Sequence, residues 1–216
     1  MAGHASHADF VLAKSRLRPV PHVPEIRLYL ADDAVVLWED TEREVGSVDQ
    51  PPPFWAFPWP GGQGLARYLL DHPDLARGRT VLDIGAGSGL TSIAAGLAGA
   101  AAVLASEPDP FAVAAIELNA AANGVEVQVT ADVLDGSGEG AGLVLAADVW
   151  YSEHLAARVL ALLRRARAAG ACVLAGDPGR AFLPRSELTE VASYQVPVAA
   201  DLEDAAVKRV LVLTLP

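Results

Sequence analysis

Residues 80–90 read TVLDIGAGSGL, and this stretch decides the fold class. Its first five residues, Thr80–Ile84, form a short apolar run that is typical of a buried strand. The glycine-rich loop 85–89 follows at once, and glycine permits a sharp turn and close approach of the backbone to a ligand. The next residues, Leu90–Leu97, are helical in character. This strand, loop and helix predict the first unit of an α/β fold whose loop contacts a cofactor.

The spacing of the glycines argues against a dinucleotide. The dinucleotide fingerprint is G-x-G-x-x-G, whereas this loop is G-x-G-x-G with Leu90 in place of the third glycine of the fingerprint. Asp83 stands two residues before the first glycine, and an acid, Glu107, follows the next predicted strand. The loop with these two acids resembles the seven-strand S-adenosylmethionine-dependent methyltransferases, in which it wraps the methionine and ribose part of the cofactor.

This resemblance implies S-adenosylmethionine as the cofactor and a role for each acid near the loop. Glu107 would accept hydrogen bonds from both ribose hydroxyls, since a carboxylate suits two adjacent donors. Asp83 would help to hold the loop, and Asp132 with Val133 would lie beside the adenine. Asp132 as a turn residue and Asp109 as a helix N-cap are the structural alternatives.

The sequence after the predicted strand Leu143–Ala147 concerns the methyl acceptor. Residues 148–153 read DVWYSE, and ligands of α/β sheets gather at the carboxyl ends of the strands. Methyltransferases that act on glutamine amides or base amines often carry an Asn-Pro-Pro-Tyr-like sequence at this place, which is absent here. An Asp-x-x-Tyr sequence stands there instead. The alternatives are Asp148 as a helix N-cap or turn residue, and Trp150 and Tyr151 as core or interface packing residues.

The Asp-x-x-Tyr sequence resembles the protein lysine methyltransferases of the group called methyltransferase family 16. Trp59 with the segment 64–70, GLARYLL, is similar to a segment of that group in which the tryptophan lies near the cofactor. The longer string at 53–63, PFWAFPWPGGQ, and GDPGR at 176–180 resemble one branch, the electron transfer flavoprotein β-subunit lysine methyltransferases and their bacterial relatives. The general resemblance covers residues 25–216.

The resemblance implies a protein substrate that presents a lysine, namely the electron transfer flavoprotein β subunit or, next, a ribosomal protein. We expect Asp148 to be the essential acceptor-side carboxylate and Tyr151 an aligning group, both catalytic. Trp150 and Arg180 are expected to face the substrate, although Gly176–Arg180 could equally be a tight turn. The residues expected to bind the cofactor are Trp59, Asp83, Gly85, Ala86, Gly87, Gly89, Glu107, Asp132, Val133 and Ala147.

Methyl transfer to an amine needs an aligned and neutral nitrogen. A free lysine has a pKa near 10.4 and must lose a proton before it reacts. The sulfonium charge and an apolar wall of Trp150 and Tyr151 would disfavour the ammonium form. Asp148 would attract the arriving ammonium and orient an N–H.

Strand and helix alternate after residue 79, which predicts a Rossmann-like, doubly wound α/β sheet. The final two strands have no helix between them and predict an antiparallel hairpin, and the resemblance implies seven strands. The expected strands are Thr80–Ile84, Ala102–Ser106, Val125–Val129, Leu143–Ala147, Ala171–Ala175, Ser193–Val198 and Ala206–Thr214. The expected helices are Gly64–Leu70, Leu90–Leu97, Pro110–Asn123, His154–Ala169 and Pro184–Val191.

The first 64 residues are less regular. We expect residues 1–24 to be a flexible N-terminus, followed by one methyltransferase domain over 25–216. Glu25–Leu30 and Val35–Asp40 predict a short β-hairpin. The five prolines of PPPFWAFPWPGGQG, at 51–64, argue against regular helix or central strand. Its aromatic rings either cap the core or line a ligand pocket.

Composition excludes several other classes. The chain has 216 residues, a net charge of −11 and only two lysines, Lys14 and Lys208, so nucleic acid is a poor candidate partner. A single cysteine, Cys172, and five scattered histidines argue against a disulfide or metal site. No apolar run reaches the length of a membrane span, and we expect neither a secretory signal nor a membrane association. A cytoplasmic location agrees with the single thiol.

Two alternative functions share the fold. A small-molecule N- or O-methyltransferase would use the same cofactor but usually adds a lid over the acceptor. A catalytically silent cofactor-binding module would keep the fold as an interaction surface. The intact glycine loop argues against the silent module, and the oligomeric state stays open.

Overall fold

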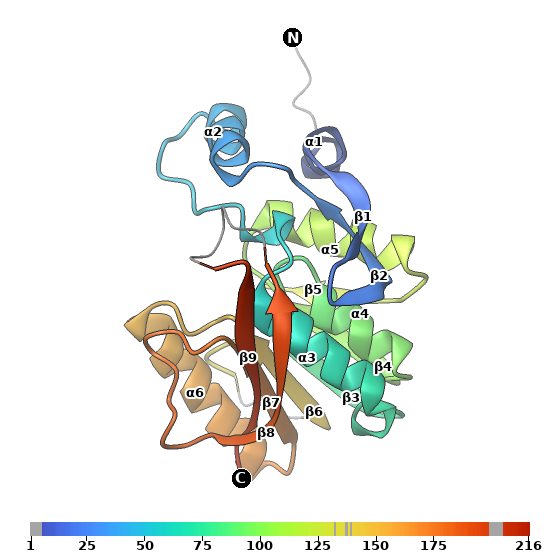
Figure 1. Ribbon diagram of the computed structural model, residues 1–216, viewed down its shortest axis with the longest axis vertical. Coiled ribbons are helices and arrows are strands. Elements are labelled where there is room, and N and C mark those ends of the chain that lie inside the picture. Colours follow the sequence, from blue (N-terminus) through green and yellow to red (C-terminus); the bar gives the residue numbers. More distant parts are fainter. Residues whose placement is uncertain (1–5, 132, 137, 139, 199–204) are drawn as a thin grey trace.

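The computed structural model describes residues 6–131, 133–136, 138, 140–198 and 205–216 (Figure 1). Its centre is a seven-stranded sheet in the order β5-β4-β3-β6-β7-β9-β8. The first five strands in this order are parallel, whereas β9 is antiparallel to both β7 and β8. The strands are β3 (Thr80–Ile84), β4 (Ala102–Ser106), β5 (Gln128–Thr130), β6 (Leu143–Ala147), β7 (Cys172–Asp177), β8 (Thr189–Pro197) and β9 (Val207–Thr214). The predicted fold class and final antiparallel hairpin are therefore confirmed.

Helices cover both faces of the sheet because the central strands are apolar on both sides. Leu143 and Leu145 pack with α3 and α4 in one core, and Val144 and Ala146 pack with α6 in a second core. This burial on two faces is typical of parallel sheets. The helices on these layers are α3 (Pro60–Asp71), α4 (Leu90–Leu97), α5 (Pro110–Ala122) and α6 (Glu153–Ala168). The arrangement brings the carboxyl ends of β3, β4 and β6 to one edge.

Regular structure begins earlier than expected. Helix α1 (His7–Lys14) is closed by a capping box between Ser6 and Asp9, and its Phe10 packs edge-on against Phe111 of α5, with ring centroids 5.0 Å apart. Phe10 and Val11 are buried, and this burial orders a segment that was expected to be flexible.

The N-terminal hairpin differs from its predicted position. It is formed by β1 (Arg16–Val20) and β2 (Val23–Leu30), not by Glu25–Leu30 with Val35–Asp40. The predicted second strand is wrong because Ala34–Val45 forms helix α2. The Asp33 carboxylate accepts the N–H groups of Val35 and Val36 at 2.9 and 3.0 Å, and this N-cap outweighs the β preference of the valines.

Two other predictions along the chain need correction. The helix expected at Pro184–Val191 is absent among these described residues, since Thr189 onward pairs with β9 as an edge strand. The proline-rich segment does contain regular helix: Pro60 opens α3, and Phe54–Ala56 forms a turn of 3₁₀ helix. Proline is favoured at the first helical position, where its missing N–H has no intrahelical partner. None of the helices in the described ranges combines the length and apolarity needed to cross a bilayer.

Candidate active site

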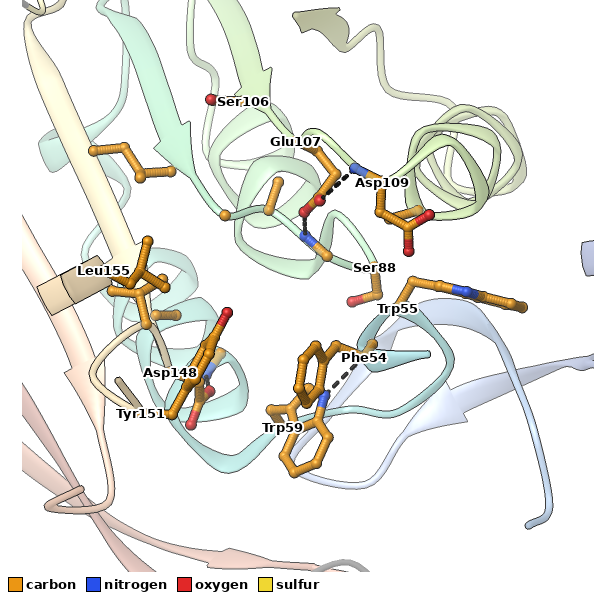
Figure 2. A pocket seen from close by; sticks show the side chains of 18 of the residues that line it. Phe54, Trp55, Trp59, Ser88, Ser106, Glu107, Asp109, Asp148, Tyr151 and Leu155 are labelled. Carbon is orange, nitrogen blue, oxygen red and sulfur yellow. Dashed lines mark hydrogen bonds between the residues drawn. The ribbon is translucent and has the colours of Figure 1, made fainter. Parts of the chain in front are cut away.

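A cavity of about 590 Å³ lies at the carboxyl ends of β3, β4 and β6. The loop after β3 and Glu107 line one part of it, which we call the glycine-loop end; Asp148, Trp59 and Arg180 line another, which we call the Asp148 end. Figure 2 shows Glu107 and Asp148 on different sides of the space, with Phe54 and Trp59 in the lower part of the view. The volume is that of a site for an organic cofactor or ligand.

The glycine loop needs glycine at the positions where it bends. Gly85 and Gly87 have φ of 63° and 53°, in the left-handed region that side chains disfavour. Both line the cavity with Ala86 between them. Gly89, with φ of 79°, caps α4 and packs against Ile116 instead. Three of the four predicted loop residues therefore line the cavity, and Gly89 shapes the turn behind them.

Glu107 links the loop to the next strand. Its Oε2 accepts the Gly87 N–H at 2.9 Å, and its Oε1 accepts the Asp109 N–H at 3.1 Å. Burial raises the pKa of this carboxyl, and the two backbone N–H groups oppose that shift. Each oxygen keeps a lone pair beyond these bonds, so the carboxylate has the capacity to accept two further hydroxyls. Asp109 itself caps α5, as the structural alternative proposed.

Asp83 supports the loop from behind. It is 1% exposed, and its Oδ2 accepts the hydroxyls of Thr91 and Ser92, each at 2.6 Å. Burial raises the pKa of Asp83 to about 6, against these two hydrogen bonds. Asp83 thus ties β3 to the first turn of α4 and is not among the residues that line the cavity.

Of the remaining residues expected to bind the cofactor, some line the cavity and Val133 is not among the lining residues. Ala147 and Trp59 line the cavity. Val133 packs against the core beneath α6. Asp132 falls outside the described residues.

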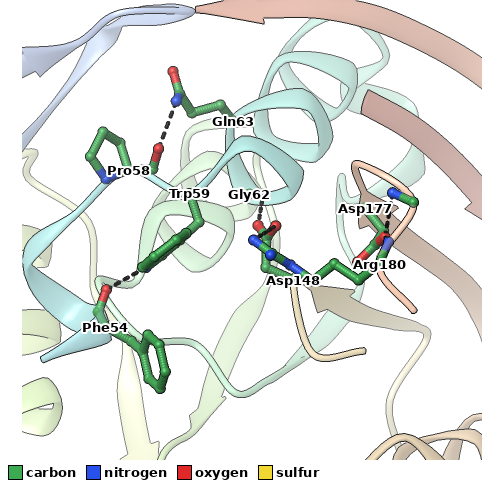
Figure 3. Close-up of polar contacts among 9 residues, drawn as sticks. Phe54, Pro58, Trp59, Gly62, Gln63, Asp148, Asp177 and Arg180 are labelled. Atoms are coloured by element: carbon green, nitrogen blue, oxygen red, sulfur yellow. Dashed lines mark hydrogen bonds and ion pairs between the residues drawn. The ribbon is translucent and has the colours of Figure 1, made fainter. Parts of the chain in front are cut away.

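Asp148 is held in an unusual backbone conformation. Its φ is 57°, a left-handed value that among the described non-glycine residues belongs to Asp148 alone. Its Oδ2 accepts the Gly62 N–H from the start of α3 at 2.7 Å, and its Oδ1 lies 3.3 Å from Nη2 of Arg180 (Figure 3). The side chain is 10% exposed. Burial raises the pKa of Asp148 to about 7, although Arg180 lowers it.

Asp148 is not the cap of the following helix. Ser152 takes that role, because its hydroxyl accepts the Leu155 N–H at 3.3 Å. The structure thereby removes the helix-cap alternative for Asp148, which stands at the bend after β6 with its carboxylate directed to Gly62 and Arg180.

The two aromatic residues after Asp148 separate. Trp150 is fully buried in the core with α6 and β7, so the expectation that it faces a substrate is wrong. Its ring packs in the apolar core between the sheet and α6, where burial of so large a surface is favourable. Tyr151 is 52% exposed and lines the cavity, with its ring centroid 5.5 Å from that of Phe54. Partial desolvation on the cavity side raises the pKa of the Tyr151 phenol, and the Glu107 carboxylate raises it further.

The aromatic string before α3 serves both roles that the sequence left open. Trp55 and Phe57 belong to a buried cluster with Phe10 and Phe111, and they also line the cavity. Phe54, which is 37% exposed, and Trp59 also line the cavity, and the Trp59 Nε1–H donates to the Phe54 carbonyl at 2.8 Å.

Sequence reasoning missed the residues that support Asp148. A Cβ placed on Gly61 would lie 2.3 Å from the carbonyl oxygen of Gly176, so only glycine lets α3 approach β7 this closely. Gly62 then supplies its backbone N–H. Asp177 accepts the N–H groups of Gly179 and Arg180 at 2.6 and 2.7 Å and folds that loop. The glycine pair after Pro60 and the Asp-Pro-Gly turn were the available signals.

Known proteins resemble this chain in sequence and in fold. The family model of the ribosomal protein L11 methyltransferase matches residues 66–171. The chain is 39% identical to the electron transfer flavoprotein β-subunit lysine methyltransferase of Rattus norvegicus, across 81% of this chain and 70% of that protein. The enzyme of the same name from Xenopus laevis is 40% identical, across 80% and 70%.

Solved structures show the same fold at low sequence identity. A Thermoplasma acidophilum protein superposes with a TM-score of 0.55 at 18% identity, covering 69% of this chain and 86% of that one. Magnesium protoporphyrin IX methyltransferase from Synechocystis, solved with bound S-adenosylmethionine, superposes with a TM-score of 0.51 at 19% identity, covering 70% and 76%. The sequence relatives lead to one conclusion: the chain belongs to the family of electron transfer flavoprotein β-subunit lysine methyltransferases.

Proposed function

We propose that this protein transfers a methyl group from S-adenosylmethionine to a lysine side chain of a partner protein, and that the partner is the electron transfer flavoprotein β subunit. The observation that carries the proposal is one cavity with two unlike ends. The glycine-loop end offers backbone and the Glu107 carboxylate, and the Asp148 end offers a second buried carboxylate. Membership of the lysine methyltransferase family supports the choice of acceptor.

The glycine-loop end fits the nucleoside of the cofactor. A carboxylate repels a phosphate but accepts the two hydroxyls of a ribose, and both Glu107 oxygens have capacity left for this. Gly85 and Gly87 keep the loop free of side chains, so the cofactor can lie against the backbone. Asp132, which the resemblance places beside the adenine, completes this part of the proposal.

When bound, the cofactor supplies a sulfonium methyl, so that the new N–C bond forms as the C–S bond breaks and S-adenosylhomocysteine leaves. The protein therefore has to align the nitrogen, exclude water and provide for the proton. Asp148 lies where an arriving ammonium would be attracted. Its Oδ2 is fixed by Gly62, so Oδ1 is the oxygen that orients an N–H and takes the proton that the methylated amine releases.

The aromatic residues at the opening suit the lysine stem. Phe54, Trp59 and Tyr151 border the path from solvent to Asp148, and Phe54 and Tyr151 are 37% and 52% exposed. Methylene groups pack well against such rings while the charged end passes inward. A rim that is open to solvent favours the side chain of a protein over an enclosed small molecule. The cytoplasmic location suggested by the composition belongs to the same proposal.

The test uses the purified protein, radiolabelled S-adenosylmethionine and the purified β subunit of the flavoprotein from the same source. We expect label on the β subunit, and mass spectrometry should place the added methyl on lysine. A cell extract lacking the gene serves as the wider pool of acceptors. Label on a different protein would keep the chemistry and reject the named substrate. Label in small molecules alone would contradict the lysine acceptor.

A further inference from the structure

We propose that Arg180 is a positioning residue that balances the charge of the Asp148 end, so that lysine is held there as a neutral amine. The inference rests on the proposed function, since it concerns the state of the acceptor nitrogen. It goes beyond that function because it assigns a role to the Arg180 guanidinium, a cation in a site that must also receive the cationic lysine of the substrate.

The first observation is where the guanidinium lies. Nη2 of Arg180 is 3.3 Å from Oδ1 of Asp148, and Cζ lies 5.6 Å from the centre of the Trp59 ring. The Arg180 side chain is 22% exposed and the Asp148 side chain 10%. Arg180 thus occupies the space next to the oxygen that would meet a lysine nitrogen (Figure 3).

The second observation is that the surroundings hold Arg180 in place. The Asp177 carboxylate fixes the backbone of the loop through the N–H groups of Gly179 and Arg180. The Trp59 ring is itself fixed by its hydrogen bond to Phe54, and a ring face favours a guanidinium over it. The contact with Asp148 is therefore maintained from both sides, by a folded loop and by an aromatic surface.

The third observation is the balance of charge around Asp148. From the end of β7 it faces Asp177, which is buried, and from the following loop Arg180; from α3 it faces the N–H groups of Gly61 and Gly62. Trp59 is neutral, Tyr151 lies beside Asp148 (Figure 2), and the same cavity is also lined by Glu107, Asp109 and Arg158. Arg185 acts on Asp177. Arg180 therefore offsets a pair of neighbouring carboxylates.

The chemical consequence concerns both partners of the acceptor complex. Carboxylates without a compensating cation would stabilise the lysine ammonium and keep its proton on the nitrogen. A guanidinium, which stays charged at every physiological pH, disfavours a second cation and lowers the pKa of Asp148, which favours its ionised form. The ammonium loses its proton to bulk water as the amine seats. Burial raises the pKa of Asp148 to about 7 even with Arg180 present, so the loss of Arg180 would raise that pKa further.

The test compares Arg180→Gln and Arg180→Lys with the wild type in the pH profile of kcat, with the flavoprotein β subunit as substrate. Without Arg180, the pKa values of Asp148 and of the bound amine both rise. We therefore expect the acidic limb of the Arg180→Gln profile to move upward by about one to three pH units, with activity recovered at alkaline pH. In Arg180→Lys, which keeps the positive charge, the acidic limb of the kcat profile should lie close to its wild-type pH. Arg164→Gln is the matched control, because Arg164 is 56% exposed and pairs with Glu187 on another surface.

A second measurement does not depend on turnover. The ¹³C resonance of the Asp148 carboxyl, assigned by its absence in Asp148→Asn, is titrated in the full-length wild type and in Arg180→Gln. A midpoint that rises in Arg180→Gln supports the inference. An unmoved midpoint overturns it, as does a loss of kcat that is equal at every pH. A raised midpoint in a protein that methylates no lysine would contradict the proposed function and leave the charge balance standing.

Discussion

The two ends of the cavity are built in opposite ways. The glycine-loop end comes from one continuous stretch and its neighbouring strand, and its carboxylate, Glu107, is held by backbone N–H groups from residues 87 and 109. The Asp148 end assembles residues from the start of α3, the end of β6 and the loop after β7. One end is thus local in sequence and the other tertiary. The comparison suggests that the cofactor and the acceptor are served by separable structures.

The substitution Asp148→Asn tests this separation with the largest expected effect, because it should disable the acceptor end and leave cofactor binding intact. Asparagine tolerates left-handed φ and can still accept the Gly62 N–H, so the fold should survive. Loss of the charge removes the group that attracts the ammonium and takes the proton, and we expect kcat to fall by at least about 100-fold. Radiolabel transfer measures kcat, and calorimetry should show unchanged cofactor affinity. Normal turnover in this variant would reject the role of Asp148.

The reciprocal change is Glu107→Gln. Glutamine keeps one acceptor oxygen, and its NH2 group can accept neither a backbone N–H nor a ribose hydroxyl, so the affinity for S-adenosylmethionine should fall by about 10-fold to 100-fold. Since the Asp148 end is untouched, kcat at saturating cofactor should stay near that of the wild type. Calorimetry gives the affinity, and Asp74→Asn, at an exposed residue that pairs with Arg77, is the control. A large fall in kcat with intact affinity would show that the two ends are coupled.

The contact between α3 and β7 is tested by the adjacent pair Gly61→Ala and Gly62→Ala. A Cβ at Gly61 would lie 2.3 Å from the Gly176 carbonyl oxygen, whereas a Cβ at Gly62 would meet the Leu90 side chain at 3.7 Å. We expect Gly61→Ala to lower the free energy of unfolding by about 1–3 kcal/mol. Gly62→Ala should leave it equal or raise it by up to about 1 kcal/mol, through helix propensity. Urea unfolding distinguishes them, and equal effects would contradict the close approach.

The smallest effect is expected at the rim. Tyr151→Phe keeps the ring against Phe54 and removes only the hydroxyl, so kcat should fall by no more than about tenfold. Tyr151→Ala removes the ring and should raise KM for the protein substrate more than it lowers kcat. Steady-state kinetics at saturating cofactor separates the two. A loss of kcat in Tyr151→Phe as large as in Asp148→Asn would make the hydroxyl a participant in the chemistry.

The same contrast between local and tertiary structure explains which features could be predicted from the sequence. The strand, glycine loop and helix over 80–97 coincide with the structure because neighbouring residues determine them. Trp150 was misplaced because sequence does not show on which side of a strand end a ring will pack. The strand expected at Val35–Asp40 failed because a single Asp33 cap reversed the preference of two valines. Arg180 was expected on the substrate side, but its contact with Asp148, 32 residues away, and that of Gly62, 86 residues away, could not be read from the sequence.

The hydrogen bond from Gly62 to Asp148 has a consequence for how such enzymes diversify. The carboxylate is anchored by a helix of the scaffold, whereas the aromatic rim at Phe54 and Tyr151 is exposed and has no part in holding it. Substitutions at the rim are therefore expected to change which protein surface docks more than they change kcat. Evolution or protein engineering can therefore exchange one acceptor protein for another by altering a few exposed positions, while the residues that hold Asp148 stay the same.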